Sequence, residues 1–224
     1  MALKAVLYDL DGLMVDSEPL HGKASEKALN AYGHTLEDIP AALRQSFYGR
    51  RVAEIAADVV NCLSLPVSPE RWARERLEIF MELVEQGINL MPGAEESLSL
   101  FEGNGLKKAV VSSGDRKYVQ KILRLTGLTS RFEAVVTGDD VTRGKPDPQC
   151  YLLGAQKLDV PPPGCLVLED AYPGIKAARA AGMKVIGVEN NFNSRFDGAD
   201  VVVSSLAAID QKVLGTLENR TSTN

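Results

Sequence analysis

Short runs of aliphatic residues recur along this chain, and they limit its possible folds more than any other feature. The six runs lie at residues 5–8, 109–111, 134–136, 166–168, 185–188 and 201–203. Helical patterns separate several of them, at 117–125, 148–158 and 174–181. Unbroken apolar strands that alternate with helices are typical of a parallel sheet covered on both faces. We therefore predict an α/β fold with a three-layer, Rossmann-like parallel sheet at its core.

The stretch after the first run differs from the rest, because it holds helical patterns and no convincing strand. Helices are expected at residues 17–33, 50–63 and 68–87. We expect residues 17–87 to form an inserted helical cap, and residues 1–16 and 88–224 to form the α/β core. Because the insert leaves from the end of the first strand, it should sit above the carboxyl edge of the sheet.

The third of these helices carries a stripe of large apolar side chains. Trp72, Leu77, Phe80 and Met81 stand at helical spacing. The stripe could face a ligand, but a seam between two helices explains it more simply, and we favour the seam.

The bulk properties restrict the partners and the compartment. The 224 residues are 45% hydrophobic and 25% charged, and the net charge of −5 disfavours nucleic acid as a partner. No apolar stretch could span a membrane, and Asp9 and Asp11 interrupt any secretory signal. The three cysteines are widely spaced and suggest a reducing compartment. We expect a cytoplasmic monomer with neither membrane nor nucleic acid as a partner.

Polar residues follow four of the expected strands at the point where each strand ends. The clusters are Asp9 with Asp11, residues 112–115, residues 137–140, and Glu169 with Asp170. In open α/β sheets, ligands bind in the crevice outside the carboxyl ends of the strands. Four polar clusters at one edge therefore favour a binding or catalytic site over ordinary surface solvation.

Asp9 and Asp11 stand two residues apart, so in extended chain both carboxylates point to the same side. Two carboxylates this close repel each other, and the repulsion drives one of them toward protonation. A divalent cation relieves this, and Mg²⁺ prefers oxygen ligands. Glu169 and Asp170 are the natural second source of carboxylate. Each acid alone could be a helix cap or a solvated surface residue, but the combination predicts a Mg²⁺ site.

Two further residues suit an anionic ligand. Lys145 lies in the stretch RGKPDP, whose prolines restrict the backbone, and a lysine held there can neutralise carboxylate and phosphate charge. Ser112 follows a strand and precedes Gly114, so its hydroxyl and nearby backbone N–H groups could bind phosphate oxygens. Taken singly, Lys145 is equally explained as a loop lysine and Ser112 as a helix cap.

Together these stretches resemble the haloacid dehalogenase superfamily of phosphohydrolases. Its four motifs match DLDGLMVD at 9–16, VVS at 110–112, GKPDP at 144–148, and LVLED at 166–170 with Gly174 nearby. Order and spacing agree over essentially the whole chain, and the insert resembles the small helical cap of that superfamily. The chain is similar to the branch that contains β-phosphoglucomutase and small sugar-phosphate or nucleotide phosphatases. The stretches LPVSPE, LMPGAE and EDAYPG also resemble pseudouridine-5'-phosphatase.

The resemblance implies specific catalytic roles. Asp9 is implied to be the nucleophile that takes up the phosphoryl group, forming an aspartyl-phosphate. Asp11 is implied to be the acid that protonates the leaving oxygen and then the base that activates water. Ser112 and Lys145 are implied to hold the phosphoryl oxygens, with Ser113 and Gly114 beside them as substrate-binding residues.

The resemblance also implies a metal site and a substrate-reading cap. The Mg²⁺ ligands would be Asp9, the backbone carbonyl of Asp11, Asp170 and Glu169. In the cap, His21 matches a histidine on the substrate side of that branch, although a partly buried helix histidine explains it equally well. In the expected turn Gly49-Arg50-Arg51, Arg50 or Arg51 could grip a distal phosphate or carboxylate, but a surface arginine pair explains them at least as well.

The predicted function is Mg²⁺-dependent hydrolysis of a small phosphorylated metabolite, either a sugar phosphate or a nucleotide-like monophosphate. A phosphomutase of the β-phosphoglucomutase type is the alternative. We find no clear counterpart of the cap lysine of that mutase, since Phe80 lies near the expected place, and this favours the phosphatase. A non-catalytic protein that binds a phosphometabolite is disfavoured, because every site position carries a functional residue type.

The end of the chain carries no chemistry that we can assign. The last ten residues, GTLENRTSTN, resemble a frayed tail. The sequence Asn219-Arg220-Thr221 matches a glycosylation acceptor only formally, because no secretory signal is present.

Overall fold

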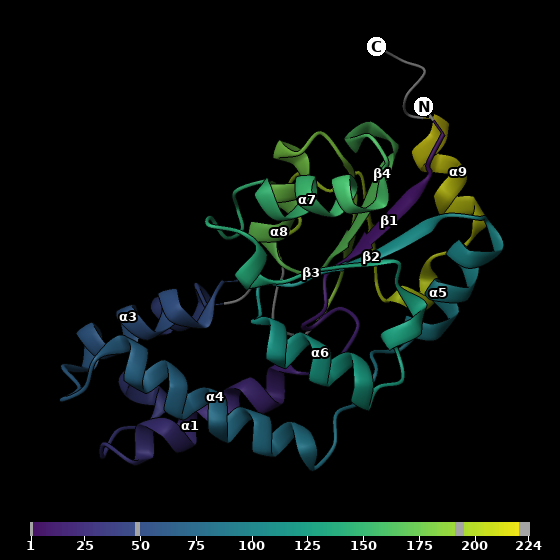
Figure 1. The fold of residues 1–224 in the computed structure, drawn as a ribbon. Helices are drawn as coiled ribbons and strands as arrows, with labels where there is room; N and C mark the ends of the chain where they lie inside the picture. The colour runs from purple at the N-terminus through teal and green to yellow at the C-terminus, as the bar shows by residue number, and fades with distance from the viewer. Residues whose placement is uncertain (1, 48–49, 191–194, 220–224) are drawn as a thin grey trace.

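The computed structural model describes residues 2–47, 50–190 and 195–219, and it is built around one parallel sheet (Figure 1). The strands are β1 (Ala5–Tyr8), β2 (Lys107–Val111), β3 (Ala134–Val136), β4 (Cys165–Glu169), β5 (Lys184–Val188) and β6 (Val201–Val203). Their order across the sheet is β3-β2-β1-β4-β5-β6, and every neighbouring pair is parallel. The predicted α/β fold is confirmed, with each expected strand in place.

Helices cover both faces of the sheet and make it the middle of three layers (Figure 1). One face carries α5 (Ala94–Gly103), α6 (Arg116–Leu125) and α9 (Gln211–Asn219), and the other carries α7 (Gln149–Leu158) and α8 (Tyr172–Ala180). Within β1, Val6 and Tyr8 pack into the first hydrophobic cluster, whereas Ala5 and Leu7 pack into the second. A strand buried on both sides alternates in this way.

The sequence patterns do not predict α5 and α9, and α9 corrects the description of the chain end. The frayed tail proposed from residue 215 onward is wrong for residues 215–219, which complete α9. The reason is that Leu214 and Leu217 stand at helical spacing and are buried in the core. Residues 220–224, and with them Arg220 and Thr221 of the formal glycosylation acceptor, lie outside the described residues.

The inserted segment is helical and packs on itself to one side of the sheet (Figure 1). Its helices are α1 (Glu18–Asn30), α2 (Ala41–Gln45), α3 (Val52–Leu63) and α4 (Pro69–Glu85), and we call them the cap. Helix α4 packs against both α1 and α3 around a separate hydrophobic cluster that contains Trp72. Ser68 begins α4 as expected, because its hydroxyl accepts the N–H of Arg71 at 3.3 Å.

Two crossings of the chain join the cap to the core, and they lie side by side. The N–H of Asp16 donates to the carbonyl of Asn89 at 2.9 Å, and the N–H of Met91 donates to the carbonyl of Met14 at 2.9 Å. These paired crossings form the connection between the cap and the core. The division at residues 17 and 87 stays a prediction, and both crossings lie close to it.

Short 3-10 turns complete the described chain. They are η1 (Leu36–Asp38), η2 (Thr129–Arg131), η3 (Gly138–Asp140), η4 (Pro162–Gly164) and η5 (Leu206–Ala208). Within the described ranges, none of the helices combines the length and the apolar character needed to cross a membrane.

Candidate active site

A cavity of about 560 Å³ is lined by the cap on one side and by the carboxyl edge of the sheet on the other. Its core wall contains Asp9, Asp11, Glu169 and Asp170, together with residues that follow β2 and β3. Its cap wall contains side chains from α1, α3 and α4. The volume is in the usual range for a small-molecule site.

The central place of β1 decides which residues meet at this edge. β1 lies between β2 and β4, and Tyr8 stands in register with Val110 on one side and Leu168 on the other. Asp9 follows Tyr8 and donates its backbone N–H to the carbonyl of Leu168 at 3.1 Å. The end of β1 is therefore placed directly beside the end of β4, which carries Glu169.

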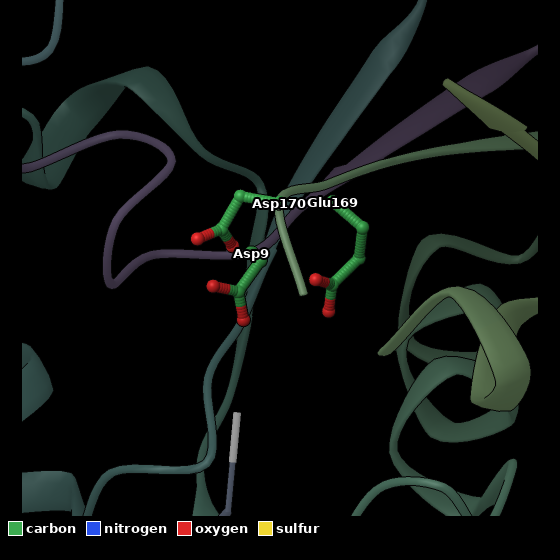
Figure 2. Close-up of side chains that lie close together, drawn as sticks. All are labelled: Asp9, Glu169 and Asp170. Carbon is green, nitrogen blue, oxygen red and sulfur yellow. The ribbon is translucent and has the colours of Figure 1, made fainter. Parts of the chain in front are cut away.

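Three carboxylates gather at this point (Figure 2). Oxygens of Asp9, Glu169 and Asp170 lie within 4.8 Å of one another, and all three residues are buried. Figure 2 shows the three side chains projecting from strand ends that are far apart in the sequence. Hard oxygen donors grouped in this way could hold a divalent cation such as Mg²⁺.

The ammonium group of Lys145 lies within this group of acids. It donates to a carboxylate oxygen of Asp9 and to Oε1 of Glu169, the latter at 2.6 Å. The hydroxyl of Tyr151 donates to the same Glu169 oxygen at 2.6 Å, and the N–H of Ala171 donates to Oε2 at 3.0 Å. Glu169 therefore anchors Lys145 beside Asp9 in addition to belonging to the carboxylate group.

Burial governs the charges of these side chains. Burial raises the pKa of Asp9 and of Asp170 well above the ordinary value for aspartate, and neighbouring carboxylates raise it further. Burial by itself would lower the pKa of Lys145, but the charges of Asp9 and Glu169 hold that pKa well above its usual range. A single lysine among three carboxylates leaves an excess of negative charge, which a divalent cation would offset.

Two glycines make room for these acids. Gly12 has a φ of 76°, which favours glycine, and a Cβ at this position would collide with the carboxylate of Asp170. A Cβ at Gly174, in the first turn of α8, would collide with the carboxylate of Glu169. The glycines of the first and fourth motifs are therefore required by the acids that they face.

Asp11 lines the same cavity, but its carboxylate has other partners. Its Oδ1 accepts the hydroxyl of Ser17 at 2.7 Å and the hydroxyl of Tyr118, and Nε2 of His21 lies 3.5 Å away. Burial would raise the pKa of Asp11, but His21, Tyr118 and Ser17 lower it overall. Ser17 precedes α1 as expected, yet its hydroxyl bonds to Asp11 instead of capping the helix. The Asp11 side chain lies outside the carboxylate group, and metal binding through its backbone carbonyl stays a prediction.

The turn after β2 brings the predicted phosphate-binding residues to the core wall. Ser112 is buried, and its hydroxyl donates to Oδ2 of Asp11 at 3.3 Å and accepts the N–H of Gly114 at 3.0 Å. Ser113 and Gly114 line the cavity. Ser112 therefore lies buried behind the cavity wall beside Asp11, and the next two residues form part of that wall.

The polar cluster after β3 serves the fold more than the site. The N–H and hydroxyl of Thr137 donate to Asp140 at 2.8 and 2.7 Å, and Arg116 pairs with the same carboxylate at 2.5 Å. Burial opposes this effect, but these bonds lower the pKa of Asp140 to about 2. Within this cluster, Gly138 and Asp139 line the cavity.

His21, on α1 of the cap, lies beside one of the core acids. Its ring stacks on Phe80, with centroids 4.0 Å apart and planes 7° from parallel. Nη2 of Arg76 lies 3.0 Å from Nδ1 of His21. Because a guanidinium can only donate, Nδ1 must accept, so the ring proton is on Nε2, the nitrogen that faces Asp11.

Arg76 is the candidate residue that the sequence analysis misses. It is buried on α4 and lines the cavity, and its Nε donates to the hydroxyl of Ser25 at 2.8 Å. Nη1 is buried and has no hydrogen-bond partner among the described residues. Burial lowers the pKa of Arg76 to about 10. The only sequence signal is its position one helical turn before Phe80, on a helix rich in charged residues.

The apolar stripe of α4 is divided between two environments. Leu77 and Phe80 line the cavity, whereas Trp72 is buried in the hydrophobic cluster of the cap. The helix-seam interpretation agrees with the burial of Trp72, and Phe80 is likewise fully buried in a hydrophobic cluster that includes Ala24 of α1, while Leu77 and Phe80 also line the cavity. The difference arises because the stripe passes along α4 from the interior of the cap to the face above the sheet.

The two neighbouring arginines at the start of α3 have different partners. Arg50 donates to Asp58 at 2.9 Å, which is an ion pair within the cap. Arg51 reaches the core and donates to the carbonyl of Val141 at 2.9 Å. Both line the cavity, and Gly49 of the predicted turn lies outside the described residues.

Comparison with known proteins agrees with this geometry. The sequence pattern of the family described as haloacid dehalogenase-like hydrolase matches residues 6–188, a range that includes the cap, the three carboxylates and Lys145. The chain belongs to this family. The resemblance seen in the sequence and the prediction of a hydrolytic enzyme are both confirmed.

Several haloacid dehalogenase-like hydrolases align along nearly the whole chain. Hexitol phosphatase A of Escherichia coli is 35% identical, over 93% of this chain and 94% of its own length. A probable pseudouridine-5'-phosphatase of Drosophila melanogaster is 32% identical, over 93% of this chain and 92% of its own length. The crystal structure of CbbY from Rhodobacter sphaeroides in complex with xylulose 1,5-bisphosphate has a TM-score of 0.82 at 26% identity, covering 92% and 96% of the two chains.

Proposed function

We propose that this hydrolase is a Mg²⁺-dependent phosphatase of small phosphorylated metabolites, either sugar phosphates or nucleotide-like monophosphates. The observation that carries the proposal is the meeting of Asp9, Glu169 and Asp170 in the wall of one cavity, with the buried ammonium group of Lys145 behind them. A nucleophile, a fixed cation and a group of hard oxygen ligands are what phosphoryl transfer requires. The relatives named as phosphatases support the same reaction.

The first step forms an aspartyl-phosphate on Asp9. An oxygen of the Asp9 carboxylate attacks phosphorus, and the bond between phosphorus and the ester oxygen breaks, with its electron pair leaving on that oxygen. The carboxyl group of Asp11 gives its proton to the ester oxygen, and the free alcohol departs. Lys145 balances the charge of the phosphoryl group, and Ser112 donates to one of its oxygens.

The second step returns the enzyme to its starting state. Water attacks the phosphorus atom of the aspartyl-phosphate while the Asp11 carboxylate accepts a proton from that water. The bond between phosphorus and the Asp9 oxygen breaks, and its electron pair restores the carboxylate. Inorganic phosphate leaves, and Asp11 carries the proton needed for the next turnover.

The residues present fit a magnesium ion. Asp9, Asp170 and Glu169 would hold it, with the backbone carbonyl of Asp11 as a further predicted ligand. The excess of buried negative charge at this point is the physical reason for a cation there. When bound, Mg²⁺ offsets negative charge on the phosphoryl oxygens.

The cap wall supports the substrate class. Arg76, Leu77 and Phe80 combine a donor with apolar surface, which suits the hydroxyls and the carbon skeleton of a sugar or polyol phosphate. The names hexitol phosphatase and pseudouridine-5'-phosphatase among the relatives point to the same range of compounds. His21, Arg50, Ser113 and Gly114 remain the proposed substrate contacts, since all four line the cavity.

A phosphate-release screen tests the proposal. Sugar phosphates, polyol phosphates and nucleoside monophosphates are incubated with the purified protein and Mg²⁺, with Asp9→Asn as the control. We expect phosphate release by the wild type and a loss of at least roughly 10³-fold in Asp9→Asn, because no other side chain replaces the nucleophile. Binding of these compounds without release, by both proteins, would instead identify a non-catalytic phosphometabolite-binding protein.

A phosphomutase is the second candidate, and one observation favours keeping it. The sequence shows no clear counterpart of the cap lysine of the mutase. Arg76, a buried cation on α4 of the cap, nevertheless lines the cavity. β-Glucose 1-phosphate separates the two functions. Formation of glucose 6-phosphate identifies a mutase, whereas free phosphate without an isomeric product identifies the phosphatase.

The remaining predictions concern the surroundings of the protein. A cytoplasmic location, a monomeric state and independence of nucleic acid and membranes are further proposals, of which the net charge of −5 supports the independence of nucleic acid and the spacing of the cysteines the reducing compartment. Size-exclusion chromatography with light scattering tests the monomer, and a mass of twice 24.2 kDa would contradict it.

A further inference from the structure

Several residues outside the four motifs hold the carboxylate of Asp11. Ser112 belongs to the second motif, whereas Ser17 and His21 follow the first motif at the start of the cap. Tyr118 comes from α6, and its hydroxyl donates to Oδ1 of Asp11. A tyrosine at this position therefore has a role that the motifs do not explain.

Packing fixes the ring of Tyr118. The residue is only 3% exposed, and its ring meets that of Phe80 edge to face, with centroids 5.3 Å apart and planes at 68°. On the other side it lies against the bare backbone of Gly114, where a Cβ would come within 2.5 Å of the ring carbon Cδ1. The hydroxyl is therefore delivered to Asp11 by a ring with little freedom to move.

The two oxygens of Asp11 are held differently. Oδ1 accepts hydroxyls from Tyr118 and Ser17, whereas Oδ2 faces Ser112, the residue assigned to the phosphoryl oxygens. Anchoring Oδ1 fixes the orientation of the carboxylate and leaves Oδ2 on the side of the phosphate site. A phenol hydroxyl donates and a carboxylate oxygen accepts, so this contact is a directed hydrogen bond from Tyr118 to Asp11.

We propose that Tyr118 is a positioning residue that anchors Oδ1 of Asp11, so that Oδ2 carries the proton exchanged with the leaving oxygen and with water. The inference rests on the proposed phosphatase reaction. Tyr118 also touches the cap through Phe80, and its ring lies 6.2 Å from that of His21. Contact with the cap therefore helps to hold the anchor in place when the cap covers the cavity.

The test uses a pair of substrates of similar shape that differ in how much they need an acid. Phenyl phosphate has a poor leaving group that requires protonation, whereas 4-nitrophenyl phosphate has a good one that does not. Tyr118→Phe removes the hydroxyl and keeps the ring. We expect kcat/KM for phenyl phosphate, which reports formation of the aspartyl-phosphate, to fall roughly 10- to 100-fold, with kcat/KM for 4-nitrophenyl phosphate changed by no more than about twofold.

Two further variants make the result decisive. Asp11→Asn should show the same preference for the good leaving group, to a larger extent. Tyr32→Phe is the matched control, because Tyr32 also donates its hydroxyl to a carboxylate, that of Glu75 at 2.5 Å, but does so within the cap and away from the cavity. We expect Tyr32→Phe to leave kcat/KM for both substrates unchanged.

The outcomes separate this inference from the proposed function. An equal loss of kcat/KM on both substrates in Tyr118→Phe, or no loss of kcat/KM on either, overturns the positioning role. If the wild type hydrolyses neither these substrates nor any compound of the phosphate-release screen faster than Asp9→Asn, the proposed phosphatase reaction itself fails and the inference fails with it. A selective loss on phenyl phosphate supports it, since a merely structural defect would lower both rates alike.

Discussion

The two walls of the cavity differ in charge, in burial and in how they are built. The core wall is acidic, and its carboxylates sit at the ends of neighbouring strands, with Lys145 buried among them. The cap wall is basic and apolar, and arginines and aromatic rings reach it from helices that are not continuous with the sheet. The core wall therefore suits chemistry common to many phosphate esters, while the cap wall suits recognition of the rest of the substrate.

Lys145 is the residue whose loss should damage the core wall most. In Lys145→Met we expect kcat to fall by roughly 10³-fold, because the group that neutralises charge beside Asp9 is gone. Without Mg²⁺ we also expect a loss of about 3–5 kcal/mol in the free energy of unfolding, because a buried ion pair is broken. Lys121→Met is the control, since Lys121 pairs with a mostly exposed Glu85. Steady-state kinetics and urea unfolding measure both effects, and equal behaviour of the two variants would contradict the assignment.

Substitution of Arg76 tests whether the cap wall contributes to substrate binding. We expect Arg76→Met to raise KM for the best substrate of the screen by roughly 10- to 100-fold with a small change in kcat, because a charged donor to the substrate is lost. Arg71→Met, on the same helix with its side chain 61% exposed, should change neither constant. A fall in kcat with an unchanged KM would place Arg76 with the acid–base residues through its contact with His21.

Alanine substitutions at two helical glycines compare how tightly the two walls are packed. Gly174→Ala places a methyl group against the carboxylate of Glu169, and we expect a loss of about 1–3 kcal/mol in the free energy of unfolding. Gly22→Ala, within α1 of the cap, meets nothing within 4 Å, and we expect a gain of about 0.5–1 kcal/mol. Thermal unfolding of both variants measures the contrast. Similar shifts in the same direction would show that the core wall has more room than the structure indicates.

The buried acids should also make stability depend on pH. Asp9 and Asp170 have folded-state pKa values raised above the ordinary 3.8, so the folded protein binds more protons than the unfolded chain. Without a divalent cation we expect the free energy of unfolding to fall as the pH rises from 3.8 through these raised values. Urea unfolding in EDTA across this range measures the trend.

Two changes at neutral pH should reverse this loss of stability if the buried acids cause it. Mg²⁺ should restore stability to the wild type by binding the folded state. Asp170→Asn should be more stable than the wild type in EDTA and should respond less to Mg²⁺, because one buried charge and one ligand are removed. A protein whose stability in EDTA rises steadily with pH would argue against raised pKa values at these positions.

The sequence by itself determined the core wall. Apolar runs identified each strand, and a parallel sheet must bring the residues after those strands to one edge, so Asp9, Ser112, Glu169 and Asp170 had to be neighbours. The short spacing between each strand and its polar residues left little freedom for another arrangement. The apolar spacing of α5 and α9 was present as well, but it was weaker than the strand pattern and went unpredicted.

Only the tertiary structure decided the partners across the cavity. No local pattern shows that Tyr118 and Ser17 anchor Asp11, that Arg76 faces the substrate, or that Arg50 and Arg51 have different partners. Each of these contacts joins elements whose relative orientation depends on how the cap helices pack with one another and with the sheet. Helix packing is set by the fit of many side chains at once, whereas strand ends are aligned by backbone hydrogen bonds that any sequence of the right pattern can make.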